Sequence, residues 1–205
     1  MTRLRAGVGL CAALLLGASP GVADPPAPAA EARSAVASFA GGCFWCMEDA
    51  FEGVDRVVSA TSGYTGGSTP HPTYEQVSAG GTGHAESVEL VFDPARISYA
   101  QLLDRYWHNV DPLTAGGQFC DHGSQYRTAI FTHDETQRRL AEETKRAVEK
   151  QLGAPVVTEI EPAGPFFPAE EYHQDYARKN PLRYHYYRAG CGRDARLERV
   201  WGKPR

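Results

Sequence analysis

Short apolar runs alternate with amphipathic stretches along most of the chain and predict a mixed set of strands and helices. Residues 34–40, 57–63, 87–92, 126–131 and 156–160 have the alternating or continuous apolar character of buried strands. Residues 43–51, 98–110, 132–153 and 169–179 show helical spacing. The order of these elements predicts an α+β domain, with helices packed on a mixed sheet as a ferredoxin-like two-layer sandwich.

Capping residues predict where the helices begin and end. Ser98 is a suitable N-cap for the second helix, and Thr132 with Glu135 forms a capping-box pattern at the start of the longest helix. Gly153 is suited to end that helix. Residues 184–205 show little periodicity, so we expect an extended coil that wraps the surface at the C-terminus.

The first 33 residues have the pattern of an export signal followed by a linker. Arg3 and Arg5 precede an apolar run over residues 7–17, and Gly21-Val22-Ala23 resembles a signal-peptidase site. The run is shorter than the roughly 20 apolar residues that span a bilayer. We therefore expect a signal peptide at 1–23, a linker at 24–33 and a folded domain at 34–205. After cleavage the protein would be periplasmic, with no membrane span.

Composition and charge exclude several classes of protein. The chain has 205 residues, of which 42% are hydrophobic, as in ordinary globular proteins. It has 21 Lys and Arg against 25 Asp and Glu, and this balance argues against a nucleic-acid partner. Five cysteines are too few for a disulfide scaffold, so each cysteine has to be interpreted individually.

The chemistry concentrates at Cys43, which follows a strand and two glycines and opens a helix together with Cys46. A helix N-terminus stabilises a thiolate, so this position predicts a lowered thiol pKa for Cys43. The Cys-x-x-Cys spacing fits a redox pair, half of a zinc site, or two packed cysteines. Spacing alone leaves these three interpretations open.

Six sequence blocks, in order, resemble the A-type peptide methionine sulfoxide reductases, and they extend over residues 38–202. The first is Gly42-Cys43-Phe44-Trp45 followed by Met47-Glu48. The others are SGYTGG at 62–67, GHAE at 83–86, D-x-G-x-QYR at 121–127, AEEYHQDY at 169–176 and CGRD at 191–194.

The resemblance implies that the protein reduces the S epimer of methionine sulfoxide, free or in oxidised proteins, in protein repair under oxidative stress. Cys43 would be the nucleophile that attacks the sulfoxide sulfur. Glu86 would be the acid that protonates the sulfoxide oxygen, and burial would keep it protonated near neutral pH.

The family pattern also implies substrate-binding roles. Tyr64 and Tyr126 would bind the sulfoxide oxygen, and Asp121 would orient the polar end of the substrate. Phe44 and Trp45 would form an apolar wall for the S-methyl group.

A second thiol has to convert the Cys43 sulfenic acid to a disulfide, which an external dithiol then reduces. The candidates for this resolving cysteine are Cys191, Cys46 and Cys120, and the sequence does not choose among them. The resemblance implies no metal or bound cofactor and a separate thioredoxin-like electron donor. We expect the protein to act as a monomer.

Two other classes of function fit part of the pattern. A thiol–disulfide oxidoreductase explains Cys43 and Cys46 but leaves Glu86 and the aromatic residues without a role. A binding domain for oxidised peptides uses the aromatic residues but needs no thiol.

Overall fold

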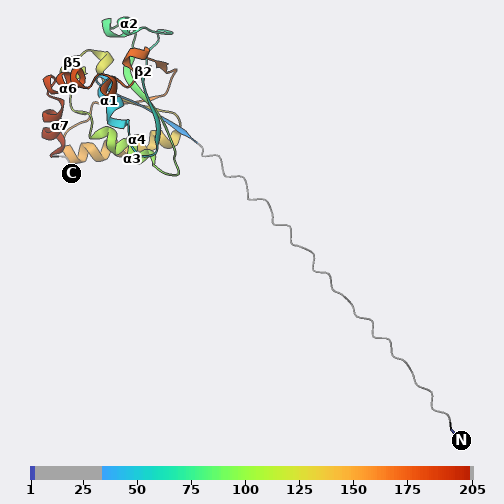
Figure 1. Ribbon diagram of the computed structural model, residues 1–205. Coiled ribbons are helices and arrows are strands. Elements are labelled where there is room, and N and C mark those ends of the chain that lie inside the picture. The colour runs from blue at the N-terminus through green and yellow to red at the C-terminus, as the bar shows by residue number, and fades with distance from the viewer. Residues whose placement is uncertain (3–33, 204–205) are drawn as a thin grey trace. The chain divides into compact units, whose positions relative to one another are not determined.

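The computed structural model describes residues 1–2 and 34–203, so the predicted signal peptide, apart from its first two residues, and the predicted linker lie outside the described residues. The domain that follows is an α+β fold (Figure 1). Its strands are β1 (Ala35–Gly41), β2 (Val57–Thr65), β3 (Ala85–Phe92), β4 (Gly117–Gln118), β5 (Asp121–His122), β6 (Thr128–Thr132), β7 (Glu159–Pro162) and β8 (Phe167–Pro168). Its α-helices are α1 (Phe44–Phe51), α2 (Tyr74–Ala79), α3 (Tyr99–Trp107), α4 (Glu135–Leu152), α5 (Tyr176–Lys179), α6 (Pro181–Gly190) and α7 (Arg193–Trp201). Two short 3-10 helices, η1 (Ser124–Tyr126) and η2 (Glu171–His173), complete the set.

Six strands form the main sheet, in the order β7-β6-β1-β3-β2-β8. The pairs β6–β1, β1–β3, β3–β2 and β2–β8 are antiparallel, whereas β6 and β7 run parallel. The predicted mixed sheet is therefore confirmed. The strands β4 and β5 form a separate small hairpin that carries Asp121.

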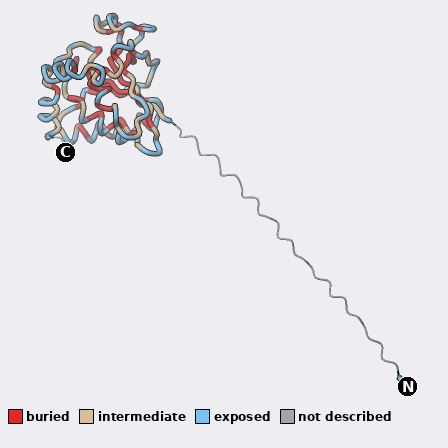
Figure 2. Tube along the Cα trace, in the orientation of Figure 1, coloured by how far each residue is buried: buried red, intermediate tan, exposed pale blue. Residues whose placement is uncertain are grey.

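Strand alternation determines which side chains meet the helices. Phe39 on β1 and the even-numbered Val88 and Leu90 on β3 belong to the main core, together with residues of α1, α3 and α4. Buried residues gather along the central strands, and exposed residues follow the outer surfaces (Figure 2). Glu86 shares the face of Val88 and Leu90, because side chains two residues apart point the same way.

The predicted helix starts are right for α3 and wrong for α4. Ser98 caps α3 with a full capping box that includes Gln101. Thr132 instead ends β6, and the N-cap of α4 is Asp134, whose carboxylate accepts the backbone N–H of Gln137. Asp134 therefore takes the capping role two residues further along, and the N–H that it accepts is that of Gln137 instead of that of Glu135.

The C-terminal predictions need two corrections. Residues 169–179 do not form one helix, because Asp175 adopts a left-handed backbone with φ 55° between η2 and α5. Residues 184–205 are not an extended coil, since α6 and α7 occupy Pro181–Gly190 and Arg193–Trp201. Long-range contacts hold these helices, including the indole N–H of Trp201, which donates to the carbonyl of Val110 at 2.9 Å.

The described residues also contain a helix that the sequence pattern did not predict. α2 lies between two glycine-rich stretches, and Thr73 and Gln76 form its capping box. Within 34–203, every helix is too short or too polar to cross a membrane.

Candidate active site

Cys43 sits at the N-cap of α1, directly after the turn that ends β1. Gly42 makes this turn with φ +83°, and a Cβ on it would lie 2.7 Å from the Gln118 side chain. Only glycine accommodates both the backbone conformation and the close approach. The turn buries the Cys43 thiol, whose residue is 6% exposed, beneath the surrounding loops.

The thiol pKa of Cys43 differs from the sequence expectation. Burial raises it well above the ordinary value, and the neighbouring Cys46 and Glu86 raise it further. The first N–H of α1, that of Phe44, donates to Glu86 Oε2 at 3.0 Å. The helix N-terminus therefore does not outweigh the loss of water around the sulfur, and Cys43 rests as a thiol.

Cys46 lies one turn further along α1, with its thiol in hydrogen-bonding range of Cys43. The hydrogen bond from Cys43 lowers the pKa of Cys46, and the guanidinium groups of Arg193 and Arg188 lower it further. Both cysteines are free and buried. The pair therefore shares one proton, with the negative charge favoured on Cys46.

Glu86 is the second residue of β3 and lies beside the Cys43–Cys46 pair. It is 2% exposed, and burial raises the pKa of its carboxyl to about 8 against the opposing hydrogen bond from Phe44. Glu86 therefore carries its proton at neutral pH, as expected from the sequence, and has the protonation state of a general acid.

Asp121 approaches Cys43 from the β4–β5 hairpin. The hydroxyl of Tyr187 on α6 donates to Asp121 Oδ2 at 2.6 Å, and the backbone N–H of Cys43 also faces this carboxylate. The same Tyr187 hydroxyl lies close enough to the Cys43 thiol for the two groups to shift each other's pKa. Burial raises the pKa of Asp121, while Tyr187 and Arg193 oppose that rise.

Phe44 and Trp45 form an apolar wall beside the thiols. The Phe44 ring centroid lies 4.9 Å from that of His173 and 6.4 Å from that of Tyr74. Trp45 stacks on Tyr176 at 3.7 Å, and its indole N–H donates to His173 Nδ1 at 3.0 Å. These contacts hold both rings in fixed orientations.

The three tyrosines near Glu86 are engaged differently. The Tyr64 hydroxyl donates to Glu170 Oε2 at 2.8 Å, although Tyr64 pairs with Glu86 across β2 and β3. Tyr74 on α2 and Tyr126 at the end of η1 both lie in the electrostatic field of Glu86 and Cys43. The structure therefore brings Tyr126 to the thiol as expected and places Tyr74, which the motif analysis missed, in the position expected of Tyr64.

Within residues 34–203, the other two cysteines are joined to each other. Cys120 and Cys191 form a disulfide with a Cα–Cα distance of 4.9 Å. It links the hairpin that carries Asp121 to the C-terminal end of α6, which carries Tyr187. Of the three candidates for the resolving cysteine, only Cys46 is a free thiol beside Cys43 in this structure.

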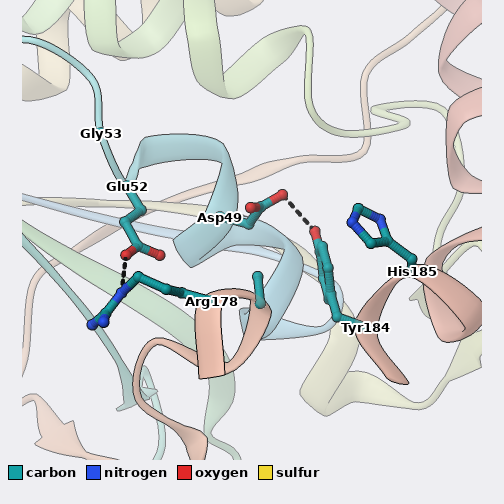
Figure 3. Close-up of a pocket in the computed structure, with 7 residues that line it drawn as sticks. Asp49, Glu52, Gly53, Arg178, Tyr184 and His185 are labelled. Atoms are coloured by element: carbon teal, nitrogen blue, oxygen red, sulfur yellow. Dashed lines mark hydrogen bonds and ion pairs between the residues drawn. The ribbon is translucent and has the colours of Figure 1, made fainter. Parts of the chain in front are cut away.

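Contacts with α1 hold both α5 and α6 against this helix (Figure 3). The Tyr184 hydroxyl donates to Asp49 Oδ2 at 2.7 Å, and Arg178 pairs with Glu52 at 3.0 Å. The hollow in Figure 3 is lined by these four residues with Gly53, Ala177 and His185, so it lies beside the thiol site and does not include Cys43 or Glu86.

The residues that the motif analysis missed come from segments without a recognised pattern. Tyr74 belongs to the unpredicted α2, and Tyr187 and Arg193 belong to the region expected to be coil. The guanidinium of Arg193 is buried and donates to the carbonyls of Asn109 at 2.6 Å and Gly41 at 3.2 Å. Only the high density of tyrosines in residues 184–187 signalled a packed element there.

Together, the fold and the site define a thiol-dependent oxidoreductase, since a buried thiol pair faces a protonated carboxylic acid and an apolar wall. A family model described as "Peptide methionine sulfoxide reductase" matches residues 35–205. The chain belongs to this family, and it is an oxidoreductase that reduces methionine sulfoxide.

Individual relatives and solved structures agree with this assignment. The chain is 51% identical over 180 residues to the peptide methionine sulfoxide reductase MsrA of Bacillus licheniformis, covering 85% of this chain and 97% of the relative. It is 49% identical over 191 residues to MsrA 2 of Caulobacter vibrioides, covering 92% and 97%. Reduced Mxr1 from Saccharomyces cerevisiae matches with a TM-score of 0.70 and 33% identity over 74% of this chain and 88% of that one. Methionine sulfoxide reductase A of Corynebacterium diphtheriae matches with a TM-score of 0.65 and 32% identity over 73% and 76%.

Proposed function

We propose that the protein reduces the S epimer of methionine sulfoxide by attack of the Cys43 sulfur on the sulfoxide sulfur. The observation that carries this proposal is the convergence of Cys43 and a protonated Glu86 at the start of α1. Once it is protonated, the sulfoxide oxygen passes to Cys43 as the substrate S–O bond breaks and a Cys43 S–O bond forms, and Glu86 holds the proton for that step. Phe44 and Trp45 take the S-methyl group, and Asp121 orients the polar end of the substrate.

Tyr126 and Tyr74 are the proposed hydrogen-bond donors to the sulfoxide oxygen. Their support is their nearness to both Cys43 and Glu86. Tyr64 does not have this role in the proposal, because its single O–H is already donated to Glu170. It instead supports the Phe44 ring, at a centroid distance of 5.9 Å.

Cys46 is the proposed resolving cysteine. The Cys46 thiolate attacks the sulfur of the Cys43 sulfenic acid, an S–S bond forms, and the hydroxyl leaves as water after protonation. The support is that Cys46 contacts Cys43 and bears the favoured negative charge, whereas Cys120 and Cys191 are bonded to each other. A separate thioredoxin-like dithiol then reduces the Cys43–Cys46 disulfide.

Export is also part of the proposal. The pattern at residues 1–23 supports a secretory signal, which would place the domain in the periplasm. Oxidised methionines and a dedicated dithiol donor would meet the enzyme there.

The test uses purified protein with dithiothreitol and the separated epimers of a methionine sulfoxide peptide. We expect reduction of the S epimer only, with no turnover by Cys43→Ser while circular dichroism remains that of the wild type. In a single turnover without reductant, Cys46→Ser should release one methionine and accumulate a sulfenic acid that dimedone traps. Normal turnover by Cys43→Ser would refute the central role of this thiol, and normal disulfide formation by Cys46→Ser would refute its role as resolver.

A further inference from the structure

The Cys43 sulfur has to lose a proton before it can attack, and its surroundings limit where that proton goes. Burial favours the thiol form of Cys43. The titratable groups that face it are Cys46 on α1, Glu86 on β3, Tyr74 on α2, Tyr126 on η1 and Tyr187 on α6. Each of these is a candidate acceptor or carrier for the proton.

Two of these candidates are needed for other steps. Glu86 already holds a proton and has to donate it to the sulfoxide oxygen. Cys46 has to be a thiolate when it attacks the sulfenic acid, so a proton taken from Cys43 would have to be lost again. Among the three tyrosines, Tyr187 differs from the others because its hydroxyl is hydrogen-bonded to a carboxylate, at 2.6 Å from Asp121 Oδ2.

We propose that Tyr187 is a catalytic residue that carries a proton from Cys43 to Asp121 and later returns it. This inference rests on the proposed function and adds a residue to it. In the first step the thiol proton passes to Tyr187 Oη while the Tyr187 O–H proton passes to Asp121 Oδ2. The products are a Cys43 thiolate and a neutral Asp121, and Tyr187 ends with one proton as before.

The same path runs backwards in the second half of the reaction. The thiolate attacks the sulfoxide sulfur and Glu86 protonates the oxygen. The O–H group then passes to Cys43 as the substrate S–O bond breaks, so that Cys43 is a sulfenic acid and methionine leaves. Cys46 then attacks, the Cys43 S–O bond breaks, and Asp121 returns its proton through Tyr187 to the departing hydroxide, which leaves as water. Two electrons from the thiol pair reduce the sulfoxide, and Glu86 regains its proton from solvent.

The structure holds both ends of this path in place. Tyr187 packs edge-on against Trp45, with ring centroids 5.7 Å apart, so the phenol ring has one orientation. The Cys120–Cys191 disulfide joins the residue next to Asp121 to the end of the helix that carries Tyr187. Burial raises the pKa of Asp121, which makes its carboxylate more basic, and Arg193 and His122 oppose that rise without reversing it.

The test measures methionine release in a single turnover by Tyr187→Phe between pH 6 and pH 10. This variant keeps the ring that packs on Trp45 and removes only the hydroxyl. At pH 7 we expect Tyr187→Phe to release methionine about 10²-fold more slowly than the wild type, which is the usual scale for a positioned proton-transfer group. The difference between the two rates should become smaller toward pH 10, because solvent hydroxide then removes the thiol proton. Tyr186→Phe, one residue away and 85% exposed, is the matched control and should behave as the wild type.

The outcomes separate the inference from its alternatives. An equal loss at every pH would indicate a purely structural role and overturn the relay, as would an unchanged rate. If Tyr187→Phe does not fold, Asp121→Asn retains a hydrogen-bond acceptor but cannot take up the proton, and it should show the same pH-dependent loss. If the wild type itself releases no methionine, the proposed function fails; if the wild type is active and both variants match it, only the relay fails.

Discussion

At the scale of single residues, the site holds two buried groups, Cys43 and Glu86, in their protonated form and a third, Cys46, in its charged form. Burial keeps a proton on Cys43 and on Glu86, since both groups would otherwise hold a negative charge without water. The hydrogen bond with Cys43, and then the nearby guanidinium groups of Arg193 and Arg188, reverse this preference at Cys46. A nucleophile, an acid and a resolving thiolate therefore coexist within one turn of helix and one strand end.

Replacing Glu86 with Gln should lower the rate of methionine release by roughly 10²-fold, because the amide cannot give a proton to the sulfoxide oxygen. The wild-type rate should also fall as pH rises through about 8, where Glu86 loses its proton. Single-turnover release measured from pH 6 to pH 10 tests both statements. A variant that retains the wild-type rate, or the same fall near pH 8, would show that another group supplies the proton.

At the scale of elements, α1 is fixed by the segments that follow it much later in the chain. Glu48 is buried in the middle of α1, near the backbone N–H groups of Asp175 and Tyr176, and neither of its carboxyl oxygens has a hydrogen-bond partner within the described residues. Burial raises the pKa of its carboxyl to about 7. Tyr176, which lies beside this carboxyl, stacks on Trp45 of the apolar wall.

Glu48→Gln should weaken the pH dependence of folding stability. The unfolded carboxyl titrates near its ordinary value of 4.5 and the folded one near 7, so between these values the folded state binds more protons and stability falls as pH rises. Between pH 5 and pH 8 this shift corresponds to a fall in the free energy of unfolding on the order of 2–3 kcal/mol, part of which the variant should lose. Urea unfolding at pH 5 and pH 8 measures the free energy of unfolding of the wild type and the variant. Glu135→Gln is the control, because Glu135 belongs to an exposed ion pair on α4. An equal fall in the wild type and Glu48→Gln would show that other groups cause it.

The elements also show why sequence alone predicts one half of the domain better than the other. β1, α1, β2, β3 and α3 follow hydrophobic periodicity, which is a local signal. α6 and α7 do not, because tertiary contacts such as the Arg188–Asp194 ion pair at 2.6 Å and the Cys120–Cys191 disulfide hold them. The helix predicted over 169–179 is interrupted where Asp175 turns toward α1, and periodicity contains no information on that turn.

The site shows the same division. The motifs point to Cys43, Glu86, Asp121 and Tyr126, all of which converge in the structure. They cannot tell which tyrosine hydroxyl is free, because the Tyr64 partner, Glu170, lies 106 residues away in sequence. Tyr187 was missed for a related reason, since its role depends on where an unpredicted helix packs.

At the scale of the whole molecule, the compartment and the Cys120–Cys191 disulfide are connected. Cys120 is exposed and Cys191 is half-buried, so both are accessible to the oxidants or reductants of their surroundings. Disulfides persist in oxidising compartments and are kept reduced in the cytosol. Export guided by residues 1–23 would therefore decide whether the link between the Asp121 hairpin and α6 forms.

Expression of the full chain in a Gram-negative bacterium should yield a periplasmic protein that lacks about 23 residues and carries the Cys120–Cys191 disulfide beside two free thiols at Cys43 and Cys46. A version that begins with Met followed by residues 24–205 should stay in the cytosol with four free thiols. Intact mass and thiol-trapped peptide mapping of each fraction distinguish these states, and Leu14→Arg, which interrupts the apolar run, is the control for export. A full-length cytosolic product from the intact chain would refute the signal peptide, and the same disulfide in both compartments would show that the fold, and not the compartment, drives its formation.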